Sequence, residues 1–285
     1  MRVLVLGASG MLGHTVFRYF SEMTEIETFG TLRSHQALRF FDESLHQRLI
    51  TAVDVENMDS LAAVLAKVKP TVVINCVGLV KQLAEANNPL LALPINALLP
   101  HRLAQLCELL NARLVHISTD CVFSGRRGFY SEQDESDATD LYGRSKFLGE
   151  VVKSPHITLR TSIIGHELNS QQGLLEWFLA QQGSVNGYDK AIFSGVPTVE
   201  LARVIAEFVL PNGLSGLYQV ASKPISKFEL LRLFAKEYGC CIEILPNSEL
   251  VLDRSLNGEK FVKVTGYQCP DWVSLIRTMR EFNHV

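Results

Sequence analysis

The sequence lacks several features that would each indicate a particular class of protein. Its six cysteines form no C-x-x-C pair, and none stands near a histidine at zinc-ligand spacing, so we expect no metal site and a reduced, cytoplasmic compartment. No apolar run reaches membrane-spanning length, and the apolar N-terminus does not have the pattern of a cleaved leader. Acidic and basic residues are interspersed around a formal net charge of −3, which argues against nucleic-acid and anionic-membrane partners. A small-molecule function is therefore the default expectation.

A glycine-rich turn follows the first expected strand. Residues 2–6 are aliphatic, Gly7-Ala-Ser-Gly10-Met-Leu-Gly13 come next, and residues 14–23 carry apolar side chains at helical spacing. Gly7 permits a tight turn, Gly10 lets the backbone approach a pyrophosphate, and Gly13 lets the helix pack closely on the strand. A purely structural turn is the alternative. The position after an N-terminal strand favours a dinucleotide site made by Gly7, Ser9, Gly10, Met11 and Leu12.

Strand and helix patterns alternate along the first half of the chain. Apolar, β-branched segments predict strands at 25–30, 50–55, 71–78, 113–119 and 157–164, with helical periodicity between them. This order predicts an α/β fold with a Rossmann-type, doubly wound parallel sheet. The pattern loosens after about residue 165, where we expect a smaller C-terminal substrate-binding lobe. The expected dinucleotide-binding domain is 1–164 with about 196–221, and the expected lobe is about 165–195 and 222–285.

The end of the second strand indicates which dinucleotide is used. An acid at this place would bond a ribose 2′-hydroxyl, but "FGTLRS" has none and contains Arg33, which favours NADP(H) and leaves NAD(H) as the alternative. A solvated loop charge is the other interpretation of Arg33. Asp54 and Val55 close the third strand and are candidates for contact with the adenine. Asp54 is also a candidate helix N-cap, although Asn57 or Asp59 is better placed for that role.

The stretch "TDLYGRSKFLGE" places Tyr142 and Lys146 four residues apart in an expected helix. Residues at i and i+4 share one helix face, so both side chains can reach one ligand. A nearby ammonium stabilises a phenolate, so we expect a lowered pKa for Tyr142 and a role as general acid. Taken alone, an exposed Tyr/Lys pair is the better interpretation, because this spacing is frequent.

Combined motifs make the pair specific. The N-terminal glycines, a strand that ends in Ser118-Thr119-Asp120, and Tyr-x-x-x-Lys about twenty residues later resemble the extended short-chain dehydrogenase/reductases. Within that superfamily the chain resembles the dTDP-4-dehydrorhamnose reductase family, from residue 1 to about 280. The matching segments are "STDCVFSG", "LYGRSKFLGE", "LRTSIIG", "LYQVASKPISKFELL" and "DRSLNGEKFVKVTGY".

The resemblance implies a role for each matching residue. Thr119 would bond the substrate carbonyl, Tyr142 would donate the proton, and Lys146 would hold the nicotinamide ribose, with hydride coming from the cofactor. Two donors at the carbonyl oxygen would stabilise the developing alkoxide. Asn96 matches an asparagine of many relatives, and a buried structural role suits it equally well. The residues implied to contact the cofactor after the fourth strand and in the catalytic helix are Cys76, Val77, Gly78, Tyr142 and Lys146.

Three departures from the family pattern concern the sugar pocket. Val80, Cys121 and Ile163 stand where the rhamnose enzymes commonly have threonine, tyrosine and tryptophan. The loss of hydroxyl and aromatic groups makes a 4-keto-6-deoxy sugar other than the L-rhamnose precursor our expectation. The implied substrate is a nucleoside-diphosphate sugar, contacted by Val80, Thr119, Asp120, Cys121, Tyr142 and Ile163.

Other activities of the superfamily use the same positions differently. A 4,6-dehydratase needs Thr-Asp-Glu, but Thr119-Asp120 is followed here by Cys121. An epimerase–reductase of the GDP-fucose synthase kind has a cysteine acid/base where Cys121 falls, yet the nearest histidine, His166, comes too early in its loop. We therefore favour Cys121 as a small buried hydrophobe. A noncatalytic NADP-binding regulatory subunit, as in methionine adenosyltransferase, is a further alternative.

Two features of the assembled protein stay open at the level of sequence. Arg254, Lys260 and Lys263 are candidates to clamp a diphosphate, or are solvated surface charges. Related enzymes are often homodimers, but no segment indicates an interface.

Overall fold

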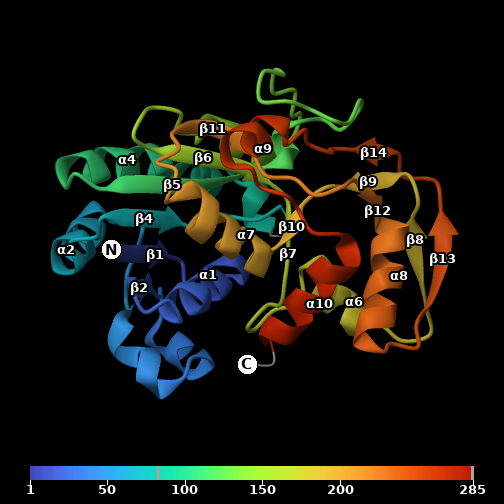
Figure 1. The fold of residues 1–285 in the computed structure, drawn as a ribbon, viewed down its shortest axis with the longest axis horizontal. Coiled ribbons are helices and arrows are strands. Elements are labelled where there is room, and N and C mark those ends of the chain that lie inside the picture. Colours follow the sequence, from blue (N-terminus) through green and yellow to red (C-terminus); the bar gives the residue numbers. More distant parts are fainter. Residues whose placement is uncertain (82–83, 284–285) are drawn as a thin grey trace.

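The computed structural model describes residues 1–81 and 84–283, and its centre is a parallel sheet of seven strands (Figure 1). The strand order is β11-β6-β5-β4-β1-β2-β3, so the chain moves outward in both directions from β1, as expected for a doubly wound Rossmann-type fold. The strands are β1 (Arg2–Leu6), β2 (Glu27–Thr31), β3 (Leu49–Ile50), β4 (Val72–Asn75), β5 (Arg113–Thr119), β6 (Ile157–Thr161) and β11 (Gly216–Gln219).

Alternate residues of the strands feed two separate cores. Val3 and Val5 of β1 face a core with α1 (Met11–Ser21) and α7 (Thr198–Val204), whereas Leu4 and Leu6 face one with α2 (Met58–Val68) and α4 (Leu99–Leu109). Because side chains alternate along a strand, a continuous aliphatic run is what a sheet covered on both faces requires.

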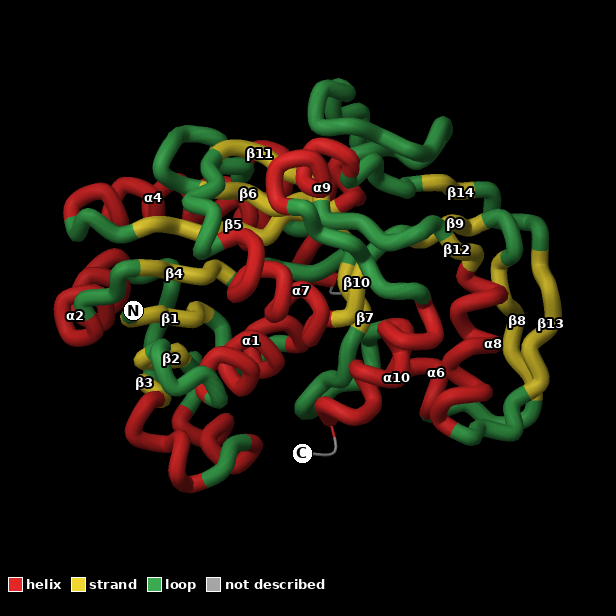
Figure 2. The backbone as a smooth tube through the Cα atoms, viewed as in Figure 1, coloured by secondary structure: helices red, strands yellow, loops and turns green. Residues whose placement is uncertain are grey.

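The remaining elements lie outside the central sheet, most of them beside the carboxyl ends of its strands. In Figure 2, β8 and β13 lie beside α8, away from the main sheet. These elements are β7 (Ile163–Ile164), α6 (Leu174–Leu179), β8 (Ser184–Tyr188), β9 (Ala191–Phe193), β10 (Val196–Pro197), β12 (Ile225–Ser226), α8 (Lys227–Tyr238), β13 (Glu243–Asn247), β14 (Leu252–Asp253), α9 (Glu259–Thr265) and α10 (Trp272–Asn283). The boundaries that we expect for two domains stay a prediction.

Helix α5 (Leu141–Leu148) carries the Tyr/Lys pair and packs against a short irregular helical segment. That segment consists of α3 (Pro89–Ala92) and the wide π-helical turn η4 (Leu93–Leu98), and it continues directly into α4. The short helical turns elsewhere are η1 (His35–Phe40), η2 (Glu43–Arg48), η3 (Ala84–Asn87), η5 (Asp120–Val122) and η6 (Ile205–Val209).

The expected third strand, 50–55, is wrong over most of its length. The strand covers only Leu49–Ile50, and Ala52 has φ of 59°. A left-handed residue turns the backbone out of the extended conformation, so the chain leaves the sheet there. The helix cap expected nearby is confirmed, because Asn57 Oδ1 accepts hydrogen bonds from the backbone N–H groups of Asp59 and Ser60.

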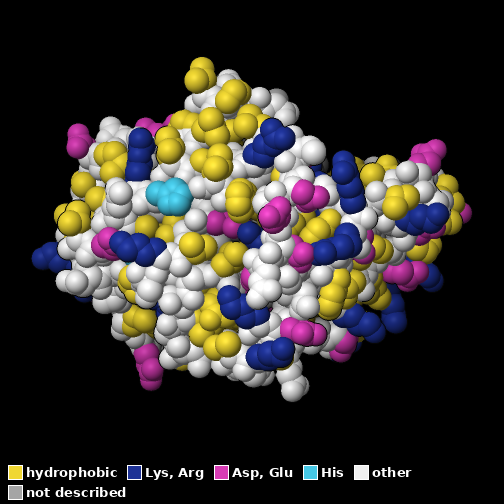
Figure 3. All heavy atoms as spheres, turned by 90° about the horizontal axis from the view of Figure 1, so that it is seen from above, with side chains coloured by type: hydrophobic (Ala, Val, Ile, Leu, Met, Phe, Trp, Pro, Cys, Tyr) yellow, Lys and Arg dark blue, Asp and Glu magenta, His cyan; other side chains and the backbone are white. Residues whose placement is uncertain are grey.

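Surface charge and helix length agree with the composition. On the face in Figure 3, basic and acidic side chains are scattered among one another, with no extended area of one sign. Across the described residues, none of the helices combines the length and the hydrophobicity that a membrane crossing needs.

Candidate active site

The glycine turn after β1 has the geometry of a dinucleotide cradle. Gly7 has φ of 78°, and its N–H donates to Thr31 Oγ1 over 3.1 Å, which ties the turn to the end of β2. A β carbon on Gly13 would overlap the carbonyl oxygen of Gly7, so the close approach requires glycine. Gly10 precedes α1 without a side-chain cap, and the first turn of the helix carries no acid. The free N–H groups of this helix end fit a pyrophosphate.

The other residues expected at the cradle differ in exposure. Ser9 is half-buried in the turn, and Met11 is half-buried at the start of α1. Leu12 is only 5% exposed and packs in the core, so any contribution to a cofactor comes from its backbone.

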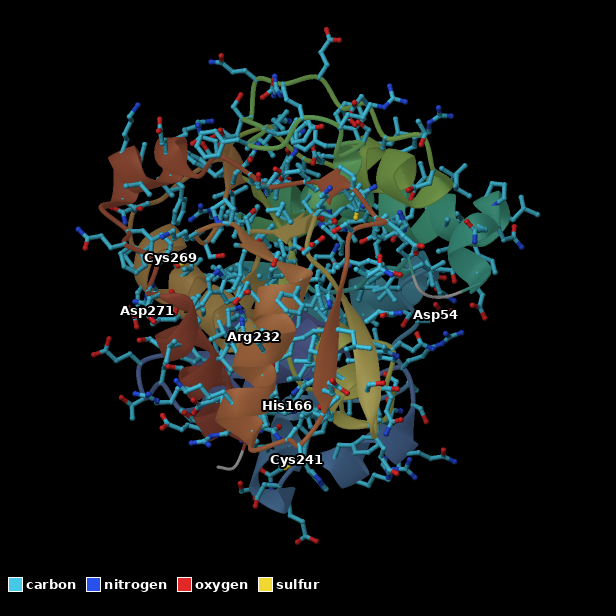
Figure 4. The ribbon with its side chains drawn as sticks, turned by 90° about the vertical axis from the view of Figure 1, so that its right-hand side faces the viewer. Asp54, His166, Arg232, Cys241, Cys269 and Asp271 are labelled. Atoms are coloured by element: carbon cyan, nitrogen blue, oxygen red, sulfur yellow. The ribbon has the colours of Figure 1, made fainter. Side chains whose placement is uncertain are left out.

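The residues expected at the adenosine end lie on exposed loops. Arg33 is exposed two residues after β2. Asp54 is exposed after β3, at the edge of the molecule in Figure 4, and its Oδ1 accepts the backbone N–H of Glu56. Val55 is half-buried against the α2 core. Their contact with a cofactor stays a prediction.

Beyond β4, two more expected residues face the glycine turn. A β carbon on Gly7 would lie 2.8 Å from the side chain of Val77, so these two loops are in contact. The backbone N–H of Cys76 donates to Leu6 O, and burial raises the pKa of the Cys76 thiol to about 12. Because β1 and β4 run parallel, both loops lie at one edge of the sheet.

Helix α5 begins at a strong cap. Asp140 Oδ1 accepts the N–H of Gly143 over 2.7 Å, and Asp140 Oδ2 pairs with Lys81 Nζ over 2.7 Å. A carboxylate at the N-cap satisfies a free N–H and interacts well with the helix dipole. The cap fixes the first turn of the helix, where Tyr142 lies.

Lys146 is buried at the carboxyl end of β5. The residue is only 6% exposed, and its Nζ donates a hydrogen bond to Ile117 O over 2.7 Å. A β carbon on Gly78 would lie 3.9 Å from Nζ, so the ammonium borders the loop after β4. Burial lowers the pKa of Lys146 to about 8, although the negative charge of Glu150 opposes this shift.

The expected lowering of the Tyr142 pKa is wrong in direction. Burial raises the pKa of the phenol, with a further contribution from Cys121, while a hydrogen bond with the Thr119 side chain acts the other way. Desolvation of the phenolate is the largest contribution, and Lys146 is not among the groups that shift this pKa. The structure therefore holds Tyr142 as a neutral phenol next to Thr119.

Asp120, Cys121 and Arg254 meet beside this tyrosine. Arg254 Nη1 lies 3.7 Å from Cys121 Sγ, and its Nε donates to Phe123 O over 2.8 Å. Burial raises the pKa of Cys121 to about 12, and burial also raises the pKa of Asp120 despite the attraction of Arg254. A thiol held in its neutral form is a poor base, but Cys121 is half-buried and contacts Arg254, so its role as a packing residue stays a prediction.

The two remaining pocket candidates are not drawn into this group by any described contact. Val80 is 45% exposed on the loop after β4. Ile163 is half-buried in β7 and packs against the α1 core. Their part in a sugar pocket stays a prediction.

The other basic and acid/base candidates are engaged elsewhere. His166 Nδ1 lies 2.6 Å from Glu176 Oε1, and its Nε2 lies 2.9 Å from the hydroxyl of Tyr238 in α8. Figure 4 labels the position of His166. Lys260 Nζ donates to Leu217 O, and Lys263 pairs with Glu259 on the surface of α9. Of the three diphosphate candidates, only Arg254 lies at the Cys121 group.

Two further residues support the site. Asn96 is 1% exposed and bonds both the N–H and the carbonyl of Leu79 as well as Ser145 Oγ, so it joins the loop after β4 to α5. Glu150, four residues after Lys146, is buried against Arg160, and sequence analysis missed it. No short spacing indicates it, because Glu150 lies just beyond the end of α5 and its partners come from two strands.

Comparisons with known proteins agree with this geometry. Residues 1–249 match the family model described as "RmlD substrate binding domain". The chain belongs to this family. It is 30% identical over 234 residues to the probable low-salt glycan biosynthesis reductase Agl14 of Haloferax volcanii, covering 78% of this chain and 75% of that protein. Over 258 residues it is 28% identical to a dTDP-4-dehydrorhamnose reductase of Mycolicibacterium smegmatis, covering 84% of this chain and 69% of that protein.

Solved structures share the fold over nearly the whole chain. A hypothetical dTDP-4-dehydrorhamnose reductase from Sulfolobus tokodaii has a TM-score of 0.77 at 26% identity, covering 95% of this chain and 98% of that one. A dTDP-4-dehydrorhamnose reductase of Bacillus anthracis, solved with NADP, has a TM-score of 0.80 at 23% identity, covering 98% of each. This RmlD-family chain is thus a sugar-nucleotide reductase of the dTDP-4-dehydrorhamnose reductase kind, with an extended short-chain dehydrogenase/reductase fold.

Proposed function

We propose that this protein uses NADPH to reduce the 4-keto group of a nucleoside-diphosphate 4-keto-6-deoxy sugar, in the cytoplasm, for deoxysugar or surface-polysaccharide synthesis. The observation that carries the proposal is the group formed by Thr119, Tyr142 and Lys146 at the carboxyl end of β5. The glycine turn after β1 lies at the same edge of the parallel sheet. The named reductases among the relatives support the reaction class.

The three side chains divide the work at the carbonyl oxygen. The bound nicotinamide would supply hydride to the carbonyl carbon. As negative charge develops on the oxygen, the Thr119 hydroxyl and the Tyr142 phenol would donate hydrogen bonds to it, and Tyr142 would transfer its proton. Its raised pKa keeps that proton in place at neutral pH. Lys146, beside Gly78, would hold the nicotinamide ribose.

The cofactor preference is supported by the loop after β2. Arg33 is exposed there and the segment contains no acid, so a 2′-phosphate would meet a cation and a 2′-hydroxyl would meet no carboxylate. We assign the cofactor to 1–164 with about 196–221, and the sugar nucleotide to about 165–195 and 222–285. Asp54, Val55 and the segment 76–78 would border the adenosine and ribose.

The sugar is proposed to differ from the rhamnose precursor. Val80, Cys121 and Ile163 would give the pocket two aliphatic side chains and a thiol in place of two hydroxyls and two aromatic side chains. Fewer donors and stacking faces change which hexose is held best. Arg254, next to Cys121, is the cation placed to approach a phosphate or a sugar hydroxyl.

The test is NADPH oxidation by the purified protein against a panel of 4-keto-6-deoxy sugar nucleotides that vary in nucleotide and in C3 and C5 configuration. We expect measurable turnover with at least one member and less with the rhamnose precursor. A protein that binds NADPH but reduces none of them would instead support a regulatory role. That second candidate rests on the methionine adenosyltransferase 2 subunit beta of Danio rerio, 30% identical over 265 residues, covering 88% of this chain and 76% of that protein.

A further inference from the structure

A buried carboxylate lies directly beyond the catalytic helix. Glu150 follows Gly149, the residue that ends α5, and its N–H donates to Phe147 O over 3.1 Å. A β carbon on Gly149 would overlap the carbonyl oxygen of Asn96, so only glycine lets the helix end settle on η4. This close approach turns the next residue toward the sheet, where the Glu150 side chain is only 5% exposed.

Side chains from two strands clamp this carboxylate. Arg160 of β6 is 3% exposed, and its Nε and Nη2 donate to the two oxygens of Glu150, each over 2.7 Å. Ser118 Oγ of β5 donates to Glu150 Oε1 over 2.8 Å. The guanidinium also lies 5.2 Å from the centre of the Phe123 ring. A bidentate pair with a third donor fixes the carboxylate in one orientation.

The same strand end also holds the ammonium of Lys146. Nζ bonds the carbonyl of Ile117, and the next residue, Ser118, bonds Glu150. Neighbouring residues of β5 thus hold a buried cation and a buried anion, four positions apart in the chain. An opposite charge at short range favours the charged form of a buried lysine.

The other charged and titratable groups around Lys146 do not supply that negative charge. Burial raises the pKa of Cys76 to about 12 and raises the pKa of Tyr142, and burial holds the pKa of His116 well below 6.5, so these three are neutral near pH 7. Arg160 is a cation. Glu150 and Cys76 are the two groups that raise the Lys146 pKa, and with the Cys76 thiol neutral near pH 7 the carboxylate of Glu150 is the negative charge that favours the ammonium.

We propose that Glu150 is a positioning residue of the reductase site: held by Arg160 and Ser118, its carboxylate keeps Lys146 cationic at neutral pH. The inference rests on the proposed function, because it assigns Lys146 to the cofactor. A reductase that needs a cationic Lys146 loses activity as pH rises through the pKa of that lysine, which is lowered to about 8. Removal of the Glu150 charge lowers this pKa further, so activity is lost at a lower pH.

The experiment is the pH profile of kcat/KM with NADPH and the best ketosugar. In Glu150→Gln the alkaline limb should move down by about one pH unit or more. Glu150→Asp keeps the negative charge, but its side chain is shorter by one methylene. We therefore expect the alkaline limb to move in the same direction by a smaller amount. The matched control is Glu200→Gln, since Glu200 is also 5% exposed and bonds one arginine bidentately and one hydroxyl, but in α7. Its limb should not move.

A second readout separates this inference from the proposed function. The side chain of Lys146 can be titrated by NMR in protein labelled at lysine Cε, with the signal assigned by its loss in Lys146→Met. If the parent protein reduces no ketosugar, the proposed function fails, and a lower Lys146 pKa in Glu150→Gln still supports the electrostatic link. If Glu150→Gln does not fold, Glu150→Asp carries the same test. An unmoved alkaline limb and an unmoved Lys146 titration in a folded Glu150 variant would overturn the inference.

Discussion

Two buried glutamate–arginine pairs in this protein have nearly the same chemistry and different surroundings. Glu150 and Glu200 are each 5% exposed, and each bonds one arginine through both oxygens and accepts one hydroxyl. Arg203 is three residues from Glu200 in the same helix and is 29% exposed. Arg160 comes from another strand than Ser118 and is 3% exposed.

The difference shows what a buried ion pair can be used for. The Glu200 pair is mostly local, and its hydroxyl partner, Tyr267, ties the C-terminal segment to α7. The Glu150 pair joins β5, β6 and the end of α5, and it lies beside Lys146. Buried ion pairs are weak evidence for stability by themselves. Their position decides whether they act on the fold or on a reacting group.

The largest expected effect separates two tyrosines, the half-buried Tyr142 of the catalytic edge and the buried Tyr267 beside Glu200. Tyr142→Phe should reduce turnover by about 10²- to 10⁴-fold, as for a lost general acid, with NADPH binding and stability little changed. Tyr267→Phe removes the bond to Glu200 and should cost about 1–3 kcal/mol of stability with turnover intact. Turnover is measured by NADPH oxidation at saturating NADPH, and the free energy of unfolding is measured by urea denaturation. A Tyr142→Phe protein that turns over like the parent ends the catalytic assignment.

The arginines allow the next comparison. Arg160→Met leaves Glu150 buried without its partner and should cost about 3–5 kcal/mol of stability. Arg203→Met should cost less, about 1–3 kcal/mol, because the Arg203 side chain is 29% exposed to water, whereas that of Arg160 is 3% exposed. Denaturant midpoints of the two variants give the answer. Equal losses would show that the strand-to-strand pair is no more demanding than the helical one.

An exposed arginine tests whether surface charge matters only where a ligand arrives. Arg33→Gln should weaken NADPH binding by about 10- to 100-fold and leave NADH binding unchanged, since the charge-assisted contact to a 2′-phosphate is lost. Arg232→Gln, in α8 and 60% exposed, is the control and should change neither. Calorimetric titration of both cofactors is the measurement. Equal affinity of the parent protein for NADPH and NADH contradicts the preference.

The smallest effect is expected at a neutral group of the catalytic edge. With its pKa raised to about 12, Cys121 should take no part in proton transfer, so neither the parent protein nor Cys121→Ser should exchange substrate C3 or C5 protons with deuterium from solvent. Cys76→Ser is a matched control, because that thiol is equally neutral. Mass spectrometry of the recovered sugar nucleotide detects exchange. Deuterium uptake that depends on Cys121 would establish the epimerase–reductase activity instead.

Much of the fold could be predicted because it depends on local patterns. Aliphatic runs, helical periodicity and the glycine turn are properties of neighbouring residues, and the parallel sheet follows from their order. The third strand failed because Ala52 adopts a left-handed conformation that alanine does not indicate.

The candidate site was predictable in its members and less so in its electrostatics. Tyr142 and Lys146 are related by helix geometry, which the sequence contains. The direction of the Tyr142 pKa depends on burial, a property of the whole fold, and the expectation was therefore wrong. The partners of Glu150 come from two strands, and no short spacing brings Ser118 and Arg160 together in the sequence.

The segment that follows β5 depends on residues that are made more than a hundred positions later. Tyr130 bridges to Leu256, its N–H bonds Ser255 O, and the N–H of Asn257 bonds Tyr130 O over 2.7 Å. Contacts between residues more than a hundred positions apart form late, because a long loop must close first. During synthesis, a nascent chain can therefore complete its glycine turn long before the segment around Tyr130 gains its contacts with residues 255–257. Residues 255–257 would have to leave the ribosome before the segment beside Thr119 gains these contacts.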